Sequence, residues 1–351
     1  MQNDMRLLVC TQIMDRTDPT LGFFVPWVTE LAERTQSVDV ICLQKGEFVL
    51  PDSVTVQSLG KESGKIPKSL SKLAYVWNFY RHVFALRGRY DAVLVHMNHE
   101  YVLLGGWIWM LLGKRVYLWR NHYEGSLLVD IASLFCKKVF CTSRYSYTGH
   151  YKKTVFMPTG VNVDSLMPEV VIARVTNSIL SLGRLSPSKR PEFLLEVYAL
   201  LAKRGVDFSA SFVGGSTDES YQSVLEERAR ELGISDRVTF VGAVPNTETY
   251  RHYRAAEVFV NASKSGMLDK SMFKAMAAGA LVVSSSLDLA RDVSGEFIFE
   301  EGNIEDLATK LAHLLSLSHA EKEVRAQSFQ ELVEKNSLPV LMDALVQQMQ
   351  Q

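Results

Sequence analysis

Three basic side chains follow a short apolar run near the middle of the chain. Arg184, Lys189 and Arg190 lie between the run at 179–182 and a stretch at 192–203 whose apolar residues recur with the period of a helix. Gly183 comes directly after the run and permits a tight turn there. Guanidinium, ammonium and the free N–H groups of a helix start stabilise the same negative charge, so the segment predicts a diphosphate pocket. A basic turn that only caps a helix fits this spacing equally well.

A pair of glycines follows the next apolar run. Gly214 and Gly215 come after 209–213 and before a helical pattern, where they can bring backbone close to a phosphate or a ribose. The full GxGxxG fingerprint is absent, and any turn from a strand to a helix can require glycine. This pair alone therefore does not identify a nucleotide site.

The third segment places backbone amides and lysines at the start of another helix. After the run at 258–261 a polar loop leads into a helix that ends at Gly279, and Lys274 lies one turn beyond Lys270 on the same face. Amides at this helix start can cradle a phosphate, with Lys270 as a charge partner. The residues expected to contact the donor here are Gly266, Met267, Leu268, Asp269, Lys270 and Ser271.

Short apolar runs alternate with helical patterns along the whole chain, which is typical of βαβ units and parallel sheets. The expected strands are 6–10, 38–43, 54–58, 92–96, 115–119, 139–142, 155–157, 179–182, 209–213, 238–241, 258–261, 281–285 and 297–299. Helices are expected at 67–87, 192–203, 221–232, 247–255, 271–278 and 304–315. The sequence predicts two doubly wound α/β domains that bind ligands in a cleft, at the carboxyl ends of their strands.

The three segments, in this order, resemble the C-terminal domain of glycosyltransferase family 4, whose members are retaining enzymes of the GT-B fold. GRLSPSK at 183–189 resembles the Arg and Lys pair on the donor diphosphate, and KAMAAGALVV at 274–283 resembles a helix and strand of that family. VGAVP at 241–245 is similar to the loop beside the nucleotide base, which nominates Val244. MPTGVNVDSLMP at 157–168 is similar to the segment that leads into the interdomain hinge.

The resemblance implies a donor, a fold and a division of labour. In the GT-B fold, two Rossmann-like domains face each other across a cleft. We expect an acceptor-side domain at 1–165, a nucleotide-sugar domain at 166–333, and a C-terminal helix at 334–351 that crosses back onto the first domain. Arg184 and Lys189 would neutralise the departing nucleotide diphosphate, so no metal and no other cofactor is expected.

The first half matches the family more loosely. Gly22, in the stretch 20–34, occupies the place of a glycine loop that closes over the donor. His122, in WRNHYEG at 119–125, occupies the place of a histidine near the transferred sugar and the acceptor, and this role rests on the resemblance. The acceptor class is a glycan or a lipid-linked saccharide.

One departure from the family pattern leaves alternatives open. The family carries a Glu before AMA that holds ribose hydroxyls, whereas this chain has Lys274, which cannot accept a hydrogen bond. Asp269 or another carboxylate substitutes, or Lys274 adds charge to a phosphate, or donor binding is weakened or lost. The other functions are therefore a catalytically impaired sugar-nucleotide or glycan-binding homologue and a sugar-nucleotide epimerase. Missing GxGxxG and GxxxxGK[ST] motifs disfavour a dehydrogenase and a nucleotide hydrolase.

Composition bounds the partners and the setting. A net charge of −1 gives no general attraction to nucleic acid. The four cysteines show no metal-ligand spacing and predict buried free thiols in a reducing, cytoplasmic compartment, and the first residues lack the pattern of a secretion signal. The apolar stretch 101–113 is too short to span a membrane, and it predicts a buried helix in preference to a membrane-associated one. The helix at 67–87 has either a solvated basic edge or a surface for anionic lipid head groups at the inner face of a membrane.

Overall fold

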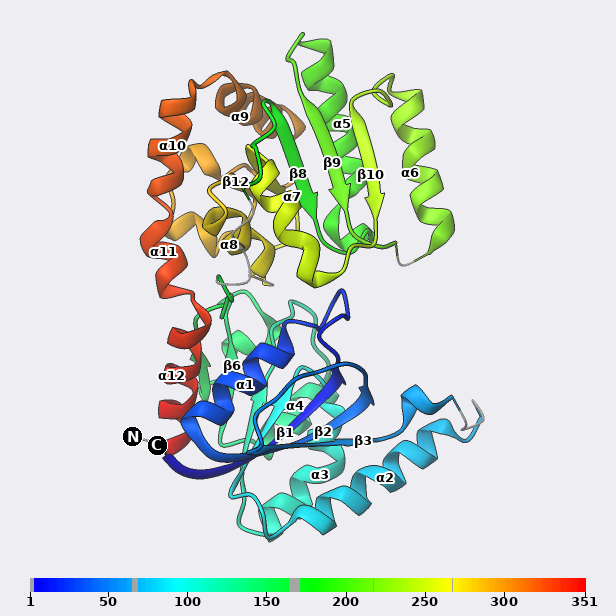
Figure 1. Cartoon of the computed structure of the whole chain (residues 1–351), viewed down its shortest axis with the longest axis vertical. Helices are drawn as coiled ribbons and strands as arrows, with labels where there is room; N and C mark the ends of the chain where they lie inside the picture. The colour runs from blue at the N-terminus through cyan, green and yellow to red at the C-terminus, as the bar shows by residue number, and fades with distance from the viewer. Residues whose placement is uncertain (1–2, 65–68, 164–170, 217, 267) are drawn as a thin grey trace. The chain divides into compact units, whose positions relative to one another are not determined.

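Figure 1 shows the computed structural model, which describes residues 3–64, 69–163, 171–216, 218–266 and 268–351. The chain forms two compact units. The first contains Met1–Pro158 and Leu338–Gln351, and the second contains Thr159–Ser337. The domain boundary expected between residues 165 and 166 lies outside the described residues.

A parallel sheet of seven strands organises the first unit, in the order β3-β2-β1-β4-β5-β6-β7. The order reverses direction beside β1, as in doubly wound α/β folds. Side chains of β1 alternate between the two faces of the sheet, with Val9 on one side and Leu8 on the other. The strands are β1 (Asn3–Met14), β2 (Thr35–Lys45), β3 (Val54–Ser58), β4 (Ala92–His96), β5 (Arg115–Trp119), β6 (Lys138–Cys141) and β7 (Thr154–Phe156).

Helices cover both faces of this sheet (Figure 1). α1 (Phe24–Arg34) and α12 (Leu338–Gln350) share one apolar core with the strands. Their neighbours on the other face are α2 (Ser71–Leu86), α3 (Glu100–Leu111) and α4 (Leu127–Leu134). The Tyr117 hydroxyl and the Arg115 guanidinium donate to the carbonyl of Met349, at 2.7 and 2.9 Å, and so fix the end of α12 to β5.

The second unit is built on a parallel sheet of five strands, in the order β10-β9-β8-β11-β12. The strands are β8 (Ser178–Leu182), β9 (Ser209–Val213), β10 (Val238–Gly242), β11 (Val258–Asn261) and β12 (Leu281–Ser284). The helices are α5 (Pro191–Lys203), α6 (Glu219–Glu231), α7 (Thr249–Ala255), α8 (Lys270–Ala277), α9 (Ile304–Ser316), α10 (His319–Gln327) and α11 (Gln330–Lys335). The carboxyl ends of β8, β9 and β11 therefore meet at one edge of the sheet.

The sequence patterns located most strands and helices, with two corrections. The strand expected at 297–299 is wrong: Gly295–Phe297 forms a 3-10 turn, and Ile298 makes only an isolated bridge to Ser284. The helix expected at 101–113 exists as α3, but the expectation that it is buried holds on one side only. Trp109 is fully buried, whereas Leu111 is 75% exposed. Among the described residues, no helix is both long enough and apolar enough to cross a membrane.

The four cysteines are buried and unbridged, as the sequence predicted. Burial raises the pKa of the Cys42 and Cys136 thiols to about 12, because a thiolate would be poorly solvated there. These side chains act as small apolar residues of the core rather than as nucleophiles.

Candidate functional site

The turns that follow β8 and β9, at the carboxyl edge of the five-stranded sheet, are in close backbone contact. A Cβ on Gly214 would lie 2.0 Å from the carbonyl oxygen of Gly183, and the φ angle of Gly214 is 142°. No other residue type fits this position without moving backbone. A Cβ on the neighbouring Gly215 would approach the Ala243 side chain at 3.2 Å. The glycines thus set the spacing between the turns that follow β8, β9 and β10.

The three cations of the basic turn after β8 differ in their surroundings. Arg184 is exposed. Arg190, in a left-handed backbone conformation at the start of α5, pairs with Glu301 at 2.7 Å. The Lys189 ammonium instead forms an ion pair with the carboxylate of Asp269, directly before α8. The structure therefore brings Lys189 to the start of α8 and gives Arg190 a different partner.

The start of α8 lacks the side-chain cap that its sequence offers. Asp269 occupies the N-cap position, but its carboxylate makes no capping hydrogen bond in the described structure. It accepts from Lys189 and from the Asn261 amide, the latter at 3.1 Å. The Asp269 carboxylate is therefore engaged by Lys189 and Asn261 rather than by the backbone of α8, and the positive end of the helix dipole at this start favours an anion.

Buried hydroxyls near the same edge have unused hydrogen-bonding capacity. Within the described part of the chain, the Oγ atoms of Ser263 and Ser271 are buried and make no hydrogen bond. Ser271 lies in the first turn of α8, and Ser263 lies two residues after β11. Such atoms call for a ligand or a water molecule. Gly266 is buried with a φ angle of 101°, Leu268 packs against the core, and Met267 lies outside the described residues.

Two lysines on α8 differ in how firmly they are held. The Lys270 ammonium donates to the carbonyls of Thr159 and Gly160, at 2.8 and 2.9 Å. Burial lowers its pKa well below the usual range, and the nearby charge of Lys274 adds to that effect. Burial also lowers the pKa of Lys274, to about 8. A buried ammonium with a lowered pKa is poorly solvated, and a bound anion stabilises its charged form. Both lysines therefore favour a negative ligand.

Lys274 is tied to the loop that follows β10. Its ammonium donates to the side-chain oxygen of Asn246 at 3.2 Å. Asn246 stands two residues beyond Val244, which is half-buried against the core of the second unit. Sequence reasoning missed both asparagines, Asn246 and Asn261. A polar residue that ends a buried apolar strand was the available signal for Asn261.

The two residues nominated in the first unit have distinct local settings. A Cβ on Gly22 would lie 2.6 Å from the Asp18 carbonyl, so glycine is required by the turn itself. The His122 Nδ1 accepts a hydrogen bond from the backbone N–H of Glu124 at 2.9 Å, and its ring stacks on Tyr123. In the neutral ring that contact leaves the proton on Nε2, so His122 can donate to a sugar oxygen.

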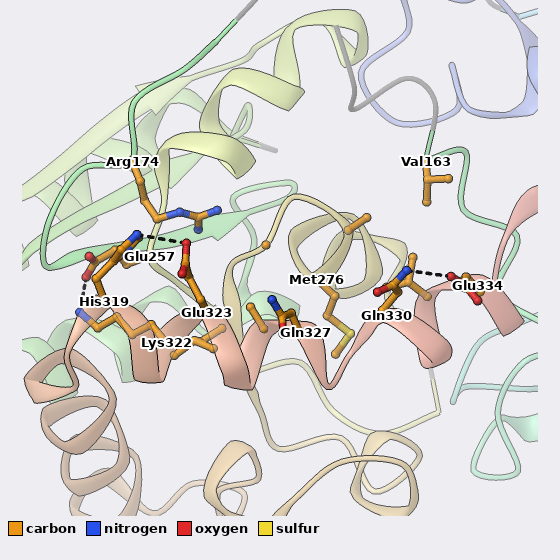
Figure 2. Close-up of a pocket in the computed structure, with 15 residues that line it drawn as sticks. Val163, Arg174, Glu257, Met276, His319, Lys322, Glu323, Gln327, Gln330 and Glu334 are labelled. Atoms are coloured by element: carbon orange, nitrogen blue, oxygen red, sulfur yellow. Dashed lines mark hydrogen bonds and ion pairs between the residues drawn. The ribbon is translucent and has the colours of Figure 1, made fainter. Parts of the chain in front are cut away.

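A larger cavity lies at the opposite edge of the five-stranded sheet. It has a volume of about 610 Å³ and is lined by residues that precede β11 and β12 and by α10 and α11 (Figure 2). Its charges are satisfied internally: Lys322 pairs with Glu257 at 2.7 Å, and Arg174 donates to the Ala256 and Ala278 carbonyls. The unsatisfied hydroxyls and the uncapped helix start belong to the other edge, which is the candidate site.

Comparison with known proteins finds similarity to glycosyltransferases, mainly in the second unit. Residues 176–317 match the family model described as glycosyl transferases group 1. An uncharacterized glycosyltransferase of Haemophilus influenzae is 25% identical over 231 residues, which are 64% of this chain and 62% of that protein. The alpha-monoglucosyldiacylglycerol synthase of Streptococcus pneumoniae is 29% identical over 123 residues, 35% of this chain and 27% of that protein. The chain thus spans less than two thirds of the length of these curated relatives.

The whole chain has the same fold as solved structures. Anabaena HepE in complex with UDP-glucose superposes with a TM-score of 0.75 at 15% identity, covering 99% of both chains. This likeness concerns architecture, since the sequence identity is low. Residues 176–317 are therefore similar to the glycosyl transferases group 1, and the chain has the GT-B fold.

Proposed function

We propose that this chain transfers a sugar from a nucleotide diphosphate sugar to an acceptor hydroxyl, without a metal ion and with retention of the anomeric configuration. The observation that carries the proposal is the ion pair of Lys189 with Asp269, which brings this cation to the start of α8. Retention rests on the family resemblance. The solved complex of HepE with UDP-glucose supports a donor of this class.

The proposed chemistry is electrostatic. When the bond between the sugar and the diphosphate breaks, negative charge develops on the departing phosphate oxygen. Arg184, Lys189 and the start of α8 stabilise that charge, and His122 donates a hydrogen bond to an oxygen of the transferred sugar. These groups supply the positive charge that Mg²⁺ supplies elsewhere, so the proposal includes no metal.

The family's glutamate before AMA is replaced by Lys274 in this chain, and we propose that Asp269 takes over its contact with the ribose. Both donors to Asp269 contact its Oδ2 atom, which leaves Oδ1 to accept from ribose hydroxyls. Lys274 cannot accept a hydrogen bond, and its lowered pKa makes it a partner for a phosphate. We therefore assign the ribose to Asp269 and assign phosphate charge to Lys274.

The proposal is tested by calorimetric titration with UDP, GDP and their sugar conjugates, followed by mass spectrometry of products. Lys189→Ala should weaken nucleotide diphosphate binding roughly tenfold to hundredfold, because a charge-assisted contact is lost. Lys203→Ala, at the exposed end of the same segment, should leave binding unchanged. Equal affinity in the wild type and Lys189→Ala would remove this site from the mechanism.

Lys274 also motivates a second candidate, a protein that binds a sugar nucleotide without turning it over. The two functions separate on slow donor hydrolysis. An enzyme releases free sugar and nucleotide from its bound donor, with or without an acceptor. Tight binding with no release over hours, and no transfer to any acceptor, would favour the binding protein.

The proposed acceptor is a glycan or a lipid-linked saccharide, at the cytoplasmic face of a membrane. The Streptococcus pneumoniae relative, an alpha-monoglucosyldiacylglycerol synthase, supports a lipid acceptor. Nucleic acid is not among the proposed partners, since the net charge is −1. A peripheral contact with the membrane is part of this proposal.

A further inference from the structure

The helical layer formed by α2, α3 and α4 has an apolar outer surface. We propose that this surface docks the protein onto a lipid bilayer that contains anionic head groups. The inference rests on the proposed function, because it names the surface for the membrane contact proposed there. It concerns helices of the first unit and uses no residue of the nucleotide site.

Large apolar side chains are concentrated on this layer. Of the 22 large hydrophobic residues exposed in the described part of the chain, 12 belong to these three helices and their caps. Trp77 is 72% exposed and Leu134 is 75% exposed. The 12 residues, called the apolar face below, are Leu70, Leu73, Trp77, Phe84, Trp107, Met110, Leu111, Leu112, Leu127, Leu128, Ile131 and Leu134.

α2 is apolar on two opposite sides. Phe79 and Val83 are fully buried against the sheet. Leu73, Trp77 and Phe84 are spaced by four and seven residues, so they form one stripe on the side that points away from that core. A helix that only covers a sheet needs one apolar stripe. The second stripe leaves contiguous apolar surface exposed, which marks an interaction site.

The apolar stripes of α3 and α4 extend the same surface. Both helices pack on the same face of the sheet as α2, and α3 contacts both neighbours (Figure 1). On α4 the exposed residues Leu127, Ile131 and Leu134 are separated by four and three residues, which again forms one stripe. Three adjacent helices thus present apolar side chains outward from one layer.

Exposed cations on α2 accompany the apolar face, and they favour an anionic surface as the partner. Residues 63–90, which include α2, contain six Lys and Arg, in a chain whose net charge is −1. No acidic residue occurs between residues 63 and 90. On α2 itself, Lys72 and Arg81 are exposed. Exposed tryptophan, aliphatic side chains and flanking cations are the combination that places a helix in the plane of a membrane interface.

The tryptophans provide a direct readout. Of the five in the chain, Trp27, Trp109 and Trp119 are buried, and Trp77 and Trp107 are exposed on the apolar face. Transfer of an exposed indole into a bilayer interface shifts its fluorescence to shorter wavelength. The full-length protein is therefore titrated with phosphatidylcholine vesicles and with vesicles that also contain phosphatidylglycerol, and binding is confirmed by flotation.

Anionic vesicles should produce a blue shift that neutral vesicles do not, and that Trp77→Phe combined with Trp107→Phe removes. Leu73→Glu combined with Leu111→Glu should abolish flotation, whereas the matched exposed substitutions Val224→Glu and Val324→Glu should not. Lys72→Glu combined with Arg81→Glu should weaken binding to anionic vesicles roughly tenfold or more. Nucleotide affinity should be unchanged in every variant, which separates this inference from the donor site.

Three outcomes would overturn the proposal. The first is equal binding to neutral and anionic vesicles, and the second is flotation without a blue shift. The third is a dimer in the absence of vesicles that Leu73→Glu and Leu111→Glu dissociate, because the apolar face would then be covered by a second copy of the chain.

Discussion

One oxygen of Asp269 receives both the Lys189 ammonium and the Asn261 amide, so a phosphate must compete with a carboxylate for Lys189. Replacing Asp269 by Asn removes the competing charge. We expect Asp269→Asn to bind pyrophosphate several-fold more tightly, because the Lys189 ammonium then lacks a fixed counter-charge. Pyrophosphate has no ribose, so this gain is free of the second role assigned to Asp269. Calorimetry measures the affinities for pyrophosphate and for UDP.

Titration of the same variant with UDP, which contains a ribose, tests the second role of Asp269. If Asp269 accepts from ribose hydroxyls, Asp269→Asn gains less affinity for UDP than for pyrophosphate, since part of the ribose contact is lost. Asp207→Asn removes a carboxylate elsewhere in the second unit, near Asn177, and should change neither affinity. Unaltered pyrophosphate binding in Asp269→Asn would mean that Lys189 does not contact the diphosphate.

We expect Lys274 to lower the free energy of unfolding of the unliganded protein at neutral pH. Its pKa falls from 10.5 to about 8 on burial, so the folded state binds its proton less tightly than the unfolded state. The penalty is complete below pH 8 and disappears as pH rises from about 8 to about 10.5, where the unfolded state also loses its proton. We expect Lys274→Met to raise the free energy of unfolding at pH 7 by about 1–3 kcal/mol.

Denaturant titrations across that pH range measure the effect. The advantage of Lys274→Met should shrink as the pH approaches 10, and nucleotide affinity at pH 7 should fall in the same variant. The exposed Lys203→Met serves as the control and should show neither change. A wild type and Lys274→Met with parallel pH profiles would show that Lys274 titrates normally.

At the scale of elements, the close turns after β8 and β9 are the rigid part of the candidate site. A Cβ on Gly214 would meet the Gly183 carbonyl at 2.0 Å, so Gly214→Ala must displace the turn that carries Arg184 and Lys189. We expect a loss of about 2–4 kcal/mol in stability, together with weaker nucleotide binding. Gly295→Ala, which meets no atom within 4 Å, is the matched control. Chemical denaturation and calorimetry report the two effects.

The elements themselves followed from the sequence where a buried run was long enough to pair. Runs such as 209–213 and 258–261 coincide with β9 and β11. β11 is buried along its whole length, as expected for a parallel strand that is covered on both faces. The run at 297–299 is equally apolar, but it finds only one bridge beside β12. Local composition carries no information on whether a neighbouring strand is within reach.

The candidate site was predictable to the extent that topology determines it. Loops after parallel strands gather at one edge, which is why Lys189 and the start of α8 meet although 80 residues separate Lys189 from Asp269. The pairing of individual side chains was not predictable. Arg190 pairs with Glu301, and Lys274 reaches Asn246, because rotamers and the exact spacing of the turns decide those contacts.

At the scale of the molecule, two separate segments of the chain build the first unit. Leu341, Met342 and Leu345 of α12 are fully buried in the core that α1 and the seven-stranded sheet provide, so α12 belongs to the first unit although the second unit precedes it in the sequence. The stability of the two units can therefore be changed separately. A substitution in α12 should act on the first unit and leave the intrinsic nucleotide affinity of the second unit intact.

Leu345→Ala tests this division. Loss of a fully buried leucine should lower the free energy of unfolding by about 2–5 kcal/mol, whereas Val340→Ala, on the exposed side of the same helix, should change it by less than about 0.5 kcal/mol. Hydrogen exchange locates the effect: amides of β1 and β4 should exchange faster in Leu345→Ala, and amides of β8 and β11 should keep their rates. Equal acceleration in both sheets would mean that the two units unfold as one cooperative structure, because a local cavity in the first core cannot otherwise reach the strands of the second.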